Sequence, residues 1–374
     1  MAEQTKSFLD KLQPSAQKKL LALDGGGIRG VLTLEILDAI EQTVRKKLNR
    51  PDAVLADYFD YIAGTSTGAV IGTCLALGMS VDQVRTFYIS SGPAMFSRAA
   101  VLRRFHYKFE QDRLAAMLRE VFGSDTTLGS TRLRTLLMMV MRNATTDSPW
   151  PVCNHPGAMF NDRKFPGCNL DLPLWQLVRA STAAPTYFPP EVVQVGGEEF
   201  LFVDGGVTMF NNPAFQLFLM ATVEPYNLSW PTGADRMLVV SVGTGAVPKA
   251  NAHLRAEDLN LVYNVSSIPG ALMFAALNQQ DFLCRCFGEC QAGPVLDMEV
   301  GDMCGKAGPA VPKLFTYMRY NAELTERGLS RLGLSGIRPE DVEALDSVEH
   351  IAELQQVGKA VAEKDVKESH FAKF

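Results

Sequence analysis

Residues 58–78 read YFDYIAGTSTGAVIGTCLALG, and this stretch determines the fold class. Its apolar start, Tyr58 to Ala63, predicts a buried strand, and Gly64-Thr65-Ser66-Thr67-Gly68 predicts a sharp turn. The small residues that follow, as far as Gly78, predict a buried helix. The uncharged run from Tyr61 to Val81 is long enough to span a membrane, but its glycines and hydroxyls are unsuited to a lipid-facing helix. The segment therefore predicts a strand, a turn and a helix within a globular core.

A similar order of strand, glycine turn and helix is found on both sides of this segment. Upstream, the strand Lys19 to Leu23 leads into Asp24-Gly25-Gly26-Gly27-Ile28-Arg29-Gly30, and apolar residues at helical spacing follow from Leu34 to Leu48. Downstream, three more apolar runs have the length of strands: Leu136 to Met141, Phe200 to Val203 and Met237 to Val242. Strands that alternate with helices predict a three-layer α/β/α sandwich around a largely parallel sheet, with a helical C-terminal extension.

The pattern divides the chain into three parts. We expect residues 1–17 to form an N-terminal arm, residues 18–250 the α/β domain that carries the candidate site, and residues 251–374 a mainly helical part packed on that domain. The stretch 145–170 is rich in Pro, Asn, Asp and Gly, which predicts a long loop. Ser80 with Gln83 predicts a capping box at the start of a helix.

Composition excludes some functions and favours others. The formal net charge of −5 argues against a nucleic-acid polymer as partner, because such binding depends on clustered Lys and Arg. Charges are spread over the first twenty residues, so no signal peptide is expected. Seven cysteines without a Cys-x-x-Cys pair indicate reduced thiols in a cytoplasmic protein. The group Cys284, Cys286, Cys290 and Cys304 is better explained as apolar side chains than as a zinc site, so neither a metal nor another cofactor is expected.

Three short segments carry the candidate chemistry. Gly64-x-Ser66-x-Gly68 places a serine on a sharp turn before a helix, whose dipole favours negative charge there. Gly25-Gly26-Gly27 can direct backbone N–H groups into a cleft, as an oxyanion hole requires, and Arg29 adds a cation. Asp204-Gly205-Gly206 places a carboxylate at a strand end, where it can accept the serine proton. Singly, each has a plainer interpretation: a structural turn, an Asp24–Arg29 ion pair or a strand-end aspartate.

In this order, the three segments resemble the patatin-like phospholipase family, which combines an Asp-Gly-Gly-Gly-x-Arg-Gly loop, a Gly-x-Ser-x-Gly turn and an Asp-Gly-Gly turn. The resemblance covers about residues 19 to 245, roughly two thirds of the chain. Further matches are Ala183-Ala184-Pro185-Thr186-Tyr187-Phe188-Pro189, Asn211-Asn212-Pro213-Ala214 and Ser241-Val242-Gly243-Thr244-Gly245.

The resemblance implies a role for each site residue. Ser66 would be the nucleophile and Asp204 its only catalytic partner, in an elbow formed with Gly64 and Gly68. The expected substrate is a phospholipid or another acyl lipid, hydrolysed through an acyl-enzyme without a metal, with transient membrane-surface contact when the enzyme is active. The oxyanion hole would comprise Gly25, Gly26 and Gly27, with the amides of Gly26 and Gly27 as donors, assisted by Arg29.

Two nucleotide-binding motifs and a catalytic triad fit the residues less well. Gly25-x-Gly27-x-x-Gly30 matches the dinucleotide fingerprint, but Asp24 would face the pyrophosphate and the next strand ends without an acid. No Lys-Ser or Lys-Thr follows the glycines, which excludes a P-loop. A triad would need a histidine after the acid, and His253 lies in a polar, loop-like setting. A serine–aspartate dyad is therefore favoured.

Regulation and lipid contact remain open at the level of sequence, as does the oligomeric state. A non-catalytic regulatory protein on this fold would be expected to lose Ser66 or Asp204, and both are present. Bacterial members of the family include antiphage effectors activated by a cyclic dinucleotide, so such an activator is a second hypothesis. The basic stretch from Arg98 to Phe109 suits either lipid phosphates or a solvated surface. The apolar stretch from Leu272 to Leu283 suits either core packing, which is favoured, or an acyl channel.

Overall fold

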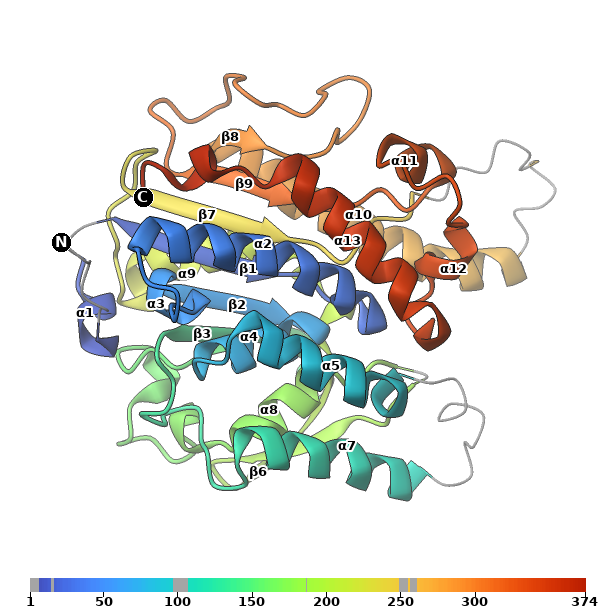
Figure 1. The fold of residues 1–374 in the computed structure, drawn as a ribbon. Coiled ribbons are helices and arrows are strands. Elements are labelled where there is room, and N and C mark those ends of the chain that lie inside the picture. Colours follow the sequence, from blue (N-terminus) through green and yellow to red (C-terminus); the bar gives the residue numbers. More distant parts are fainter. Residues whose placement is uncertain (1–6, 15–16, 97–106, 186, 249–254, 256–260) are drawn as a thin grey trace.

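A nine-stranded sheet forms the centre of the computed structural model, which describes residues 7–14, 17–96, 107–185, 187–248, 255 and 261–374 (Figure 1). The strand order is β5-β6-β3-β2-β1-β7-β9-β8, and β4 pairs with β3. The pairs from β3 through β2, β1, β7 and β9 to β8 are parallel, whereas β3–β4, β3–β6 and β5–β6 are antiparallel. The strands are β1 Lys18–Leu23, β2 Tyr61–Thr65, β3 Leu136–Asn143, β4 Ser148–Cys153, β5 Glu191–Val195, β6 Glu198–Asp204, β7 Met237–Val242, β8 Glu289–Ala292 and β9 Thr316–Tyr320.

Helices cover both faces of the sheet, which confirms the three-layer α/β/α prediction. In β1, Leu21 and Leu23 join the core under α2, α4, α5 and α13, whereas Leu20 and Ala22 join the core under α9 and α10. Successive side chains of a strand point to opposite faces, so an apolar strand is buried on both sides. These helices are α2 Gly30–Leu48, α4 Thr67–Ala76, α5 Val81–Phe96, α9 Ala214–Thr222, α10 Leu261–Phe287 and α13 Ile351–Asp365; shorter or peripheral ones are α1 Phe8–Leu12, α3 Leu55–Tyr58, α7 Tyr107–Phe122, α8 Leu174–Ser181, α11 Glu326–Arg331 and α12 Pro339–Glu343.

The C-terminal part differs from the prediction in one respect. Helices α10 to α13 confirm its helical character, but β8 and β9 were not predicted, and both belong to the central sheet. In Figure 1, β9 lies beside β7, and the register places Arg319 opposite Ser241. Residues beyond 250 therefore complete the sheet as well as packing against it.

Local signals were recovered with small shifts. The capping box at α5 is confirmed, because Ser80 N donates to Gln83 Oε1 at 2.9 Å and Gln83 N donates to Ser80 Oγ at 3.3 Å. The expected loop at 145–170 also contains β4, which pairs with β3. In the described part of the N-terminal arm, the Lys11 side chain is buried and donates to Phe59 O at 3.0 Å.

The uncharged run from Tyr61 forms β2, in the middle of the sheet, and α4, which packs on one face of it. Within the described chain, no helix combines the length and apolar character needed to cross a bilayer. The strand register then positions the candidate site: Thr65 pairs with Val140 of β3, and the next residue of β3, Met141, pairs with Asp204. The C-terminal ends of β2 and β6 thus flank β3, at the edge of the sheet where α/β proteins bind ligands.

Candidate active site

Ser66 occupies the turn between β2 and α4 in a strained backbone conformation. Its φ of 54° and ψ of −122° lie in a region that side-chain-bearing residues rarely adopt. The flanking glycines permit the close approach that this turn requires: a Cβ on Gly64 would lie 2.0 Å from Gly68 O, and one on Gly68 would lie 2.2 Å from Leu23 O. A serine on so tight a turn between a strand and a helix has the geometry that a nucleophile elbow requires.

Asp204 accepts hydrogen bonds from the Ser66 hydroxyl and from a backbone amide. Ser66 Oγ donates to Asp204 Oδ2 at 2.6 Å, and the Gly206 amide donates to Asp204 Oδ1 at 2.6 Å. Burial raises the pKa of Asp204 to about 6, and the hydrogen bonds from Ser66 and Gly206 partly oppose the rise. At neutral pH the carboxylate is therefore ionised, yet its pKa is close enough to neutrality for it to act as a general base.

The C-terminal end of α8 supports both residues of this pair, which sequence reasoning did not foresee. Ser66 N donates to Ser181 Oγ at 2.9 Å, and Ser181 Oγ donates to Val140 O at 2.6 Å. Asp204 N donates to Ala183 O at 2.9 Å. The sequence did single out the segment that begins at Ala183, just after the helix, as a match to the family pattern. The contacts of this region with Ser66 and Asp204 could be found only from the structure.

The glycine loop lies beside Ser66. A Cβ on Gly25 would stand 3.1 Å from Ser66 Cβ. The Gly25 amide donates to Asn211 O at 3.2 Å, and Thr244 Oγ1 donates to Gly25 O at 2.9 Å. The amides of Gly26 and Gly27 make no hydrogen bond with any residue that the structure describes. The Gly27 carbonyl accepts from Thr67 Oγ1 at 2.7 Å and from Tyr88 OH at 2.5 Å. The loop is thus held at both Gly25 and Gly27 and retains two amide donors, as an oxyanion site needs.

Arg29 follows the loop, but the ion pair with Asp24 that a structural turn would have used is absent. Asp24 binds Arg319 through both carboxylate oxygens, and Arg29 Nη1 donates to Glu343 O at 3.3 Å. Burial lowers the pKa of Arg29 to about 10, which leaves the side chain cationic at neutral pH. Its Nε atom is buried without a hydrogen-bond partner. Arg29 therefore retains donor capacity beside the glycine loop.

Only some of the residues named for the rival sites belong to the described part of the chain. No described histidine hydrogen-bonds to Ser66, and His253 lies outside the described residues. No group of three or more candidate metal ligands occurs in the described part of the chain, where Cys290 Sγ and Cys304 Sγ lie 3.6 Å apart. The basic residues Arg98 to His106 also fall outside the description. The prediction that the stretch from Leu272 packs in the core is wrong for Leu272 itself, whose side chain on α10 is 64% exposed.

Fold and site together define a class: an α/β/α protein with a serine on a strained turn, hydrogen-bonded to a buried aspartate. The model of the family described as patatin-like phospholipase matches residues 21–218, which are 198 of the 374 residues. The chain belongs to the patatin-like phospholipase family.

Individual relatives agree with this assignment. Patatin-T5 from Solanum tuberosum is 28% identical over 256 residues, and Patatin group D-3 from the same plant is 29% identical over 256 residues. Each match covers 64% of this chain and 63% of the relative, so the chain spans less than two thirds of their length. VipD from Legionella pneumophila is similar in structure with a TM-score of 0.36 and 13% identity, covering 91% of this chain and 67% of VipD; this likeness is too low to add to the assignment.

Proposed function

We propose that this protein hydrolyses acyl esters of lipids, phospholipids in particular, with Ser66 as nucleophile and Asp204 as general base. The observation that carries the proposal is the 2.6 Å hydrogen bond from Ser66 Oγ to Asp204 Oδ2, made by a serine in a strained turn. Family membership supports the same chemistry. A buried carboxylate with a raised pKa is a base matched to neutral pH.

In the proposed acylation step, Ser66 Oγ attacks the ester carbonyl carbon as its proton passes to Asp204 Oδ2. The oxyanion that forms accepts hydrogen bonds from the amides of Gly26 and Gly27, and Arg29 adds positive charge nearby. The tetrahedral intermediate collapses, the C–O bond to the alcohol breaks, and Asp204 returns the proton to the leaving oxygen. The products of this step are a lysolipid or alcohol and the acyl-enzyme.

Deacylation repeats the sequence with water as nucleophile. Asp204 accepts a proton from a water molecule that attacks the acyl carbon, and Ser66 leaves with the proton returned to its oxygen. The fatty acid is released and the free enzyme is restored. Asp204 thus takes up and returns the proton in both steps of the cycle.

Contact with a lipid surface is part of the proposal. Apolar side chains stand exposed close to the site: Val207 at 39% and Met209 at 52%, just after Asp204, and Leu345 at 38%. Leu345 lies beside the glycine loop, because Ile28 N donates to its carbonyl at 2.9 Å. Exposed apolar residues around a site suit contact with lipid rather than with a polar substrate.

The test is fatty-acid release from mixed phospholipid vesicles by the wild type and Ser66→Ala. We expect release by the wild type and a loss of at least about 1000-fold in the variant, because removal of a nucleophile leaves only the rate enhancement due to binding and oxyanion contacts. Ser335→Ala, an exposed serine on the surface, is the matched control and should retain full activity. Equal release by wild type and Ser66→Ala would refute the mechanism.

The same assay separates a constitutive enzyme from the gated alternative. Vesicles are incubated with a panel of cyclic dinucleotides, and release by the wild type is compared with and without each one. Release without any nucleotide identifies a constitutive lipase. Release only in the presence of one nucleotide identifies a gated enzyme, and a rise in melting temperature with that nucleotide would confirm binding to the folded protein.

A further inference from the structure

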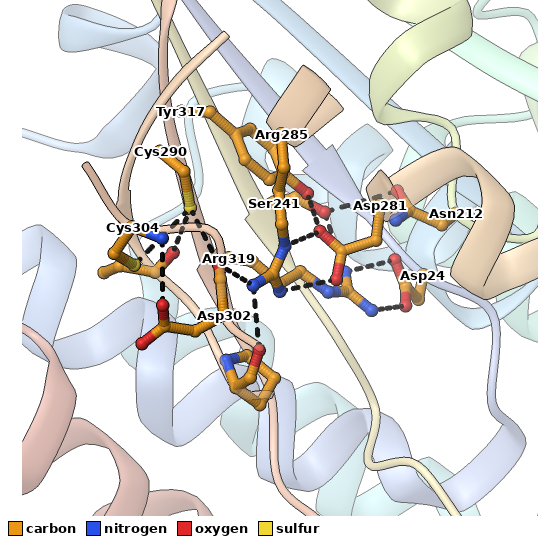
Figure 2. A network of polar contacts seen from close by, with 12 residues as sticks. Asp24, Asn212, Ser241, Asp281, Arg285, Cys290, Asp302, Cys304, Tyr317 and Arg319 are labelled. Carbon is orange, nitrogen blue, oxygen red and sulfur yellow. Dashed lines mark hydrogen bonds and ion pairs between the residues drawn. The ribbon is translucent and has the colours of Figure 1, made fainter. Parts of the chain in front are cut away.

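The carboxylate of Asp24 is fixed next to the glycine loop by an arginine from the C-terminal part. Asp24 stands between β1 and Gly25, and its Oδ1 accepts from Arg319 Nη1 at 2.9 Å while Oδ2 accepts from Nη2 (Figure 2). Asp24 is 1% exposed and Arg319 2% exposed. Two parallel hydrogen bonds between planar groups fix the direction of the carboxylate as well as its distance.

Arg319 reaches Asp24 across β7, which lies between β1 and β9. On the way, its Nη1 donates to Ser241 Oγ at 2.7 Å, and Ser241 Oγ donates to Asn212 Oδ1 at 3.3 Å (Figure 2). The preceding residue, Asn211, accepts the Gly25 amide through its carbonyl. Contacts of Arg319 therefore lead to the glycine loop by two routes, through the Asp24 side chain and through the Asn211-Asn212 segment.

A second ion pair lies in the same network but does not contact the loop. Arg285 donates to Asp281 through Nε at 2.9 Å and Nη2 at 2.7 Å, and Tyr317 OH donates to Asp281 Oδ1 at 2.9 Å (Figure 2). Burial acts to lower the pKa of Arg319, but the carboxylate of Asp24 outweighs it and raises the pKa, so Arg319 remains a cation. Burial also raises the pKa of Asp24, and the guanidinium of Arg319 opposes that rise.

The energetics favour positioning over stability as the use of the Asp24–Arg319 pair. Desolvation of two buried charges offsets most of their attraction, so such a pair adds little net stability. The pair instead fixes the orientation of Asp24 at the start of a loop of three glycines, which have no side chains of their own to restrict the backbone. An oxyanion hole depends on that precision, because a displacement of about 1 Å can cost on the order of 100-fold in rate.

We infer that Arg319 is a positioning residue for the acyl-transfer site: by holding Asp24, it orients the glycine loop so that the free amides of Gly26 and Gly27 face the substrate carbonyl. The inference rests on the proposed function. Arg319 lies beyond residues 21–218, the part that the family model matches. The C-terminal part of the chain would therefore complete the site by fixing the residue that precedes the glycine loop.

Two matched substitutions test this role in the full-length protein. Arg319→Lys retains a positive charge but cannot form the two-point bond with Asp24. We expect its kcat on a soluble p-nitrophenyl ester to fall about 10- to 100-fold while KM changes less than about 3-fold. Arg285→Lys makes the same change in the pair that does not contact the loop. It should retain kcat within about 3-fold even where its melting temperature falls as much as that of Arg319→Lys.

Hydrogen exchange provides a readout that does not depend on hydrolysis. The peptide covering residues 24–30 should exchange at least about 10-fold faster in Arg319→Lys than in the wild type, and at the wild-type rate in Arg285→Lys. Equal effects of both substitutions on kcat and on exchange, or no effect of Arg319→Lys on exchange, would overturn the positioning role. A wild type without Ser66-dependent hydrolysis would refute the proposed function instead, and the exchange result would still decide the role of Arg319.

Discussion

Two Asp-Gly-Gly turns follow strands of the same sheet, and their carboxylates have different partners. Asp24 directly follows β1 and precedes Gly25 and Gly26, and Asp204 is the last residue of β6 and precedes Gly205 and Gly206. Both are buried, at 1% and 5% exposure. Asp24 is bound by the guanidinium of Arg319 through both oxygens, whereas Asp204 accepts a neutral hydroxyl and a backbone amide.

The difference shows that the neighbouring charge, rather than the motif, decides what a buried carboxylate can do. Burial raises the pKa of Asp24 as well, but the guanidinium of Arg319 opposes that rise and fixes the carboxylate through both oxygens, so this carboxylate suits a fixed anchor. Without a cation in contact, Asp204 has its pKa raised by burial to about 6, and it can exchange a proton with Ser66 near neutral pH. The same Asp-Gly-Gly motif therefore provides an anchor at Asp24 and a candidate base at Asp204.

The largest effect is expected when Asp204 loses its ability to take a proton. Asp204→Asn should lower kcat by about 1000- to 10000-fold, because an amide cannot serve as the general base. The same change should raise stability at neutral pH by up to about 3 kcal/mol, because it removes a carboxylate that is costly to ionise when buried. Ester hydrolysis and urea unfolding measure the two effects on one preparation.

Opposite signs for activity and stability are what make this variant informative. A loss of activity that is accompanied by a loss of stability would mean that Asp204 mainly holds the fold together. Wild-type activity in Asp204→Asn would exclude Asp204 as the base. Asp24→Asn serves as the comparison, since it removes the same charge from the same motif.

For Asp24→Asn, the main effect should be on stability. The substitution leaves Arg319 as a buried cation without its carboxylate, which should cost about 3–5 kcal/mol in free energy of unfolding. The double variant Asp24→Asn/Arg319→Met removes both charges and should recover a large part of that loss. Urea unfolding of the two single variants and the double variant measures the coupling, and additive losses would show that the pair is not coupled.

Much of the candidate site could be read from the sequence, because local signals specify it. Glycines on either side of Ser66 report a tight turn, and the apolar runs before Ser66 and Asp204 report strands that end at these residues. The positive φ of Ser66 and the hydrogen bond to Asp204 are consistent with those signals. Residues far apart in the chain were placed together by the order of motifs and the resemblance, not by spacing alone.

The partner of Asp24 could not be read in the same way. Arg319 lies 295 positions later, on a strand that was not predicted, and the nearby Arg29 was the partner that local sequence suggested. The strand Thr316–Tyr320 is only five residues long and alternates little, because both of its faces are buried. Periodicity is a weak guide to such short buried strands, and long-range ion pairs have no local signature.

The smallest expected effect is the pH response, and it tests the ionisation of Asp204 directly. Asp204 must be ionised to accept the serine proton, so kcat/KM should fall about tenfold for each pH unit below an apparent pKa of about 6. Stability should change in the opposite direction: the contribution of Asp204 is fully present below its unfolded pKa of about 4 and is lost as pH rises through about 6. The difference in unfolding free energy between wild type and Asp204→Asn, measured across this range, isolates that contribution. An acid limb near pH 4 would mean that Asp204 is not desolvated, whereas a limb near 6 with the opposite trend in stability would assign both to this one carboxylate.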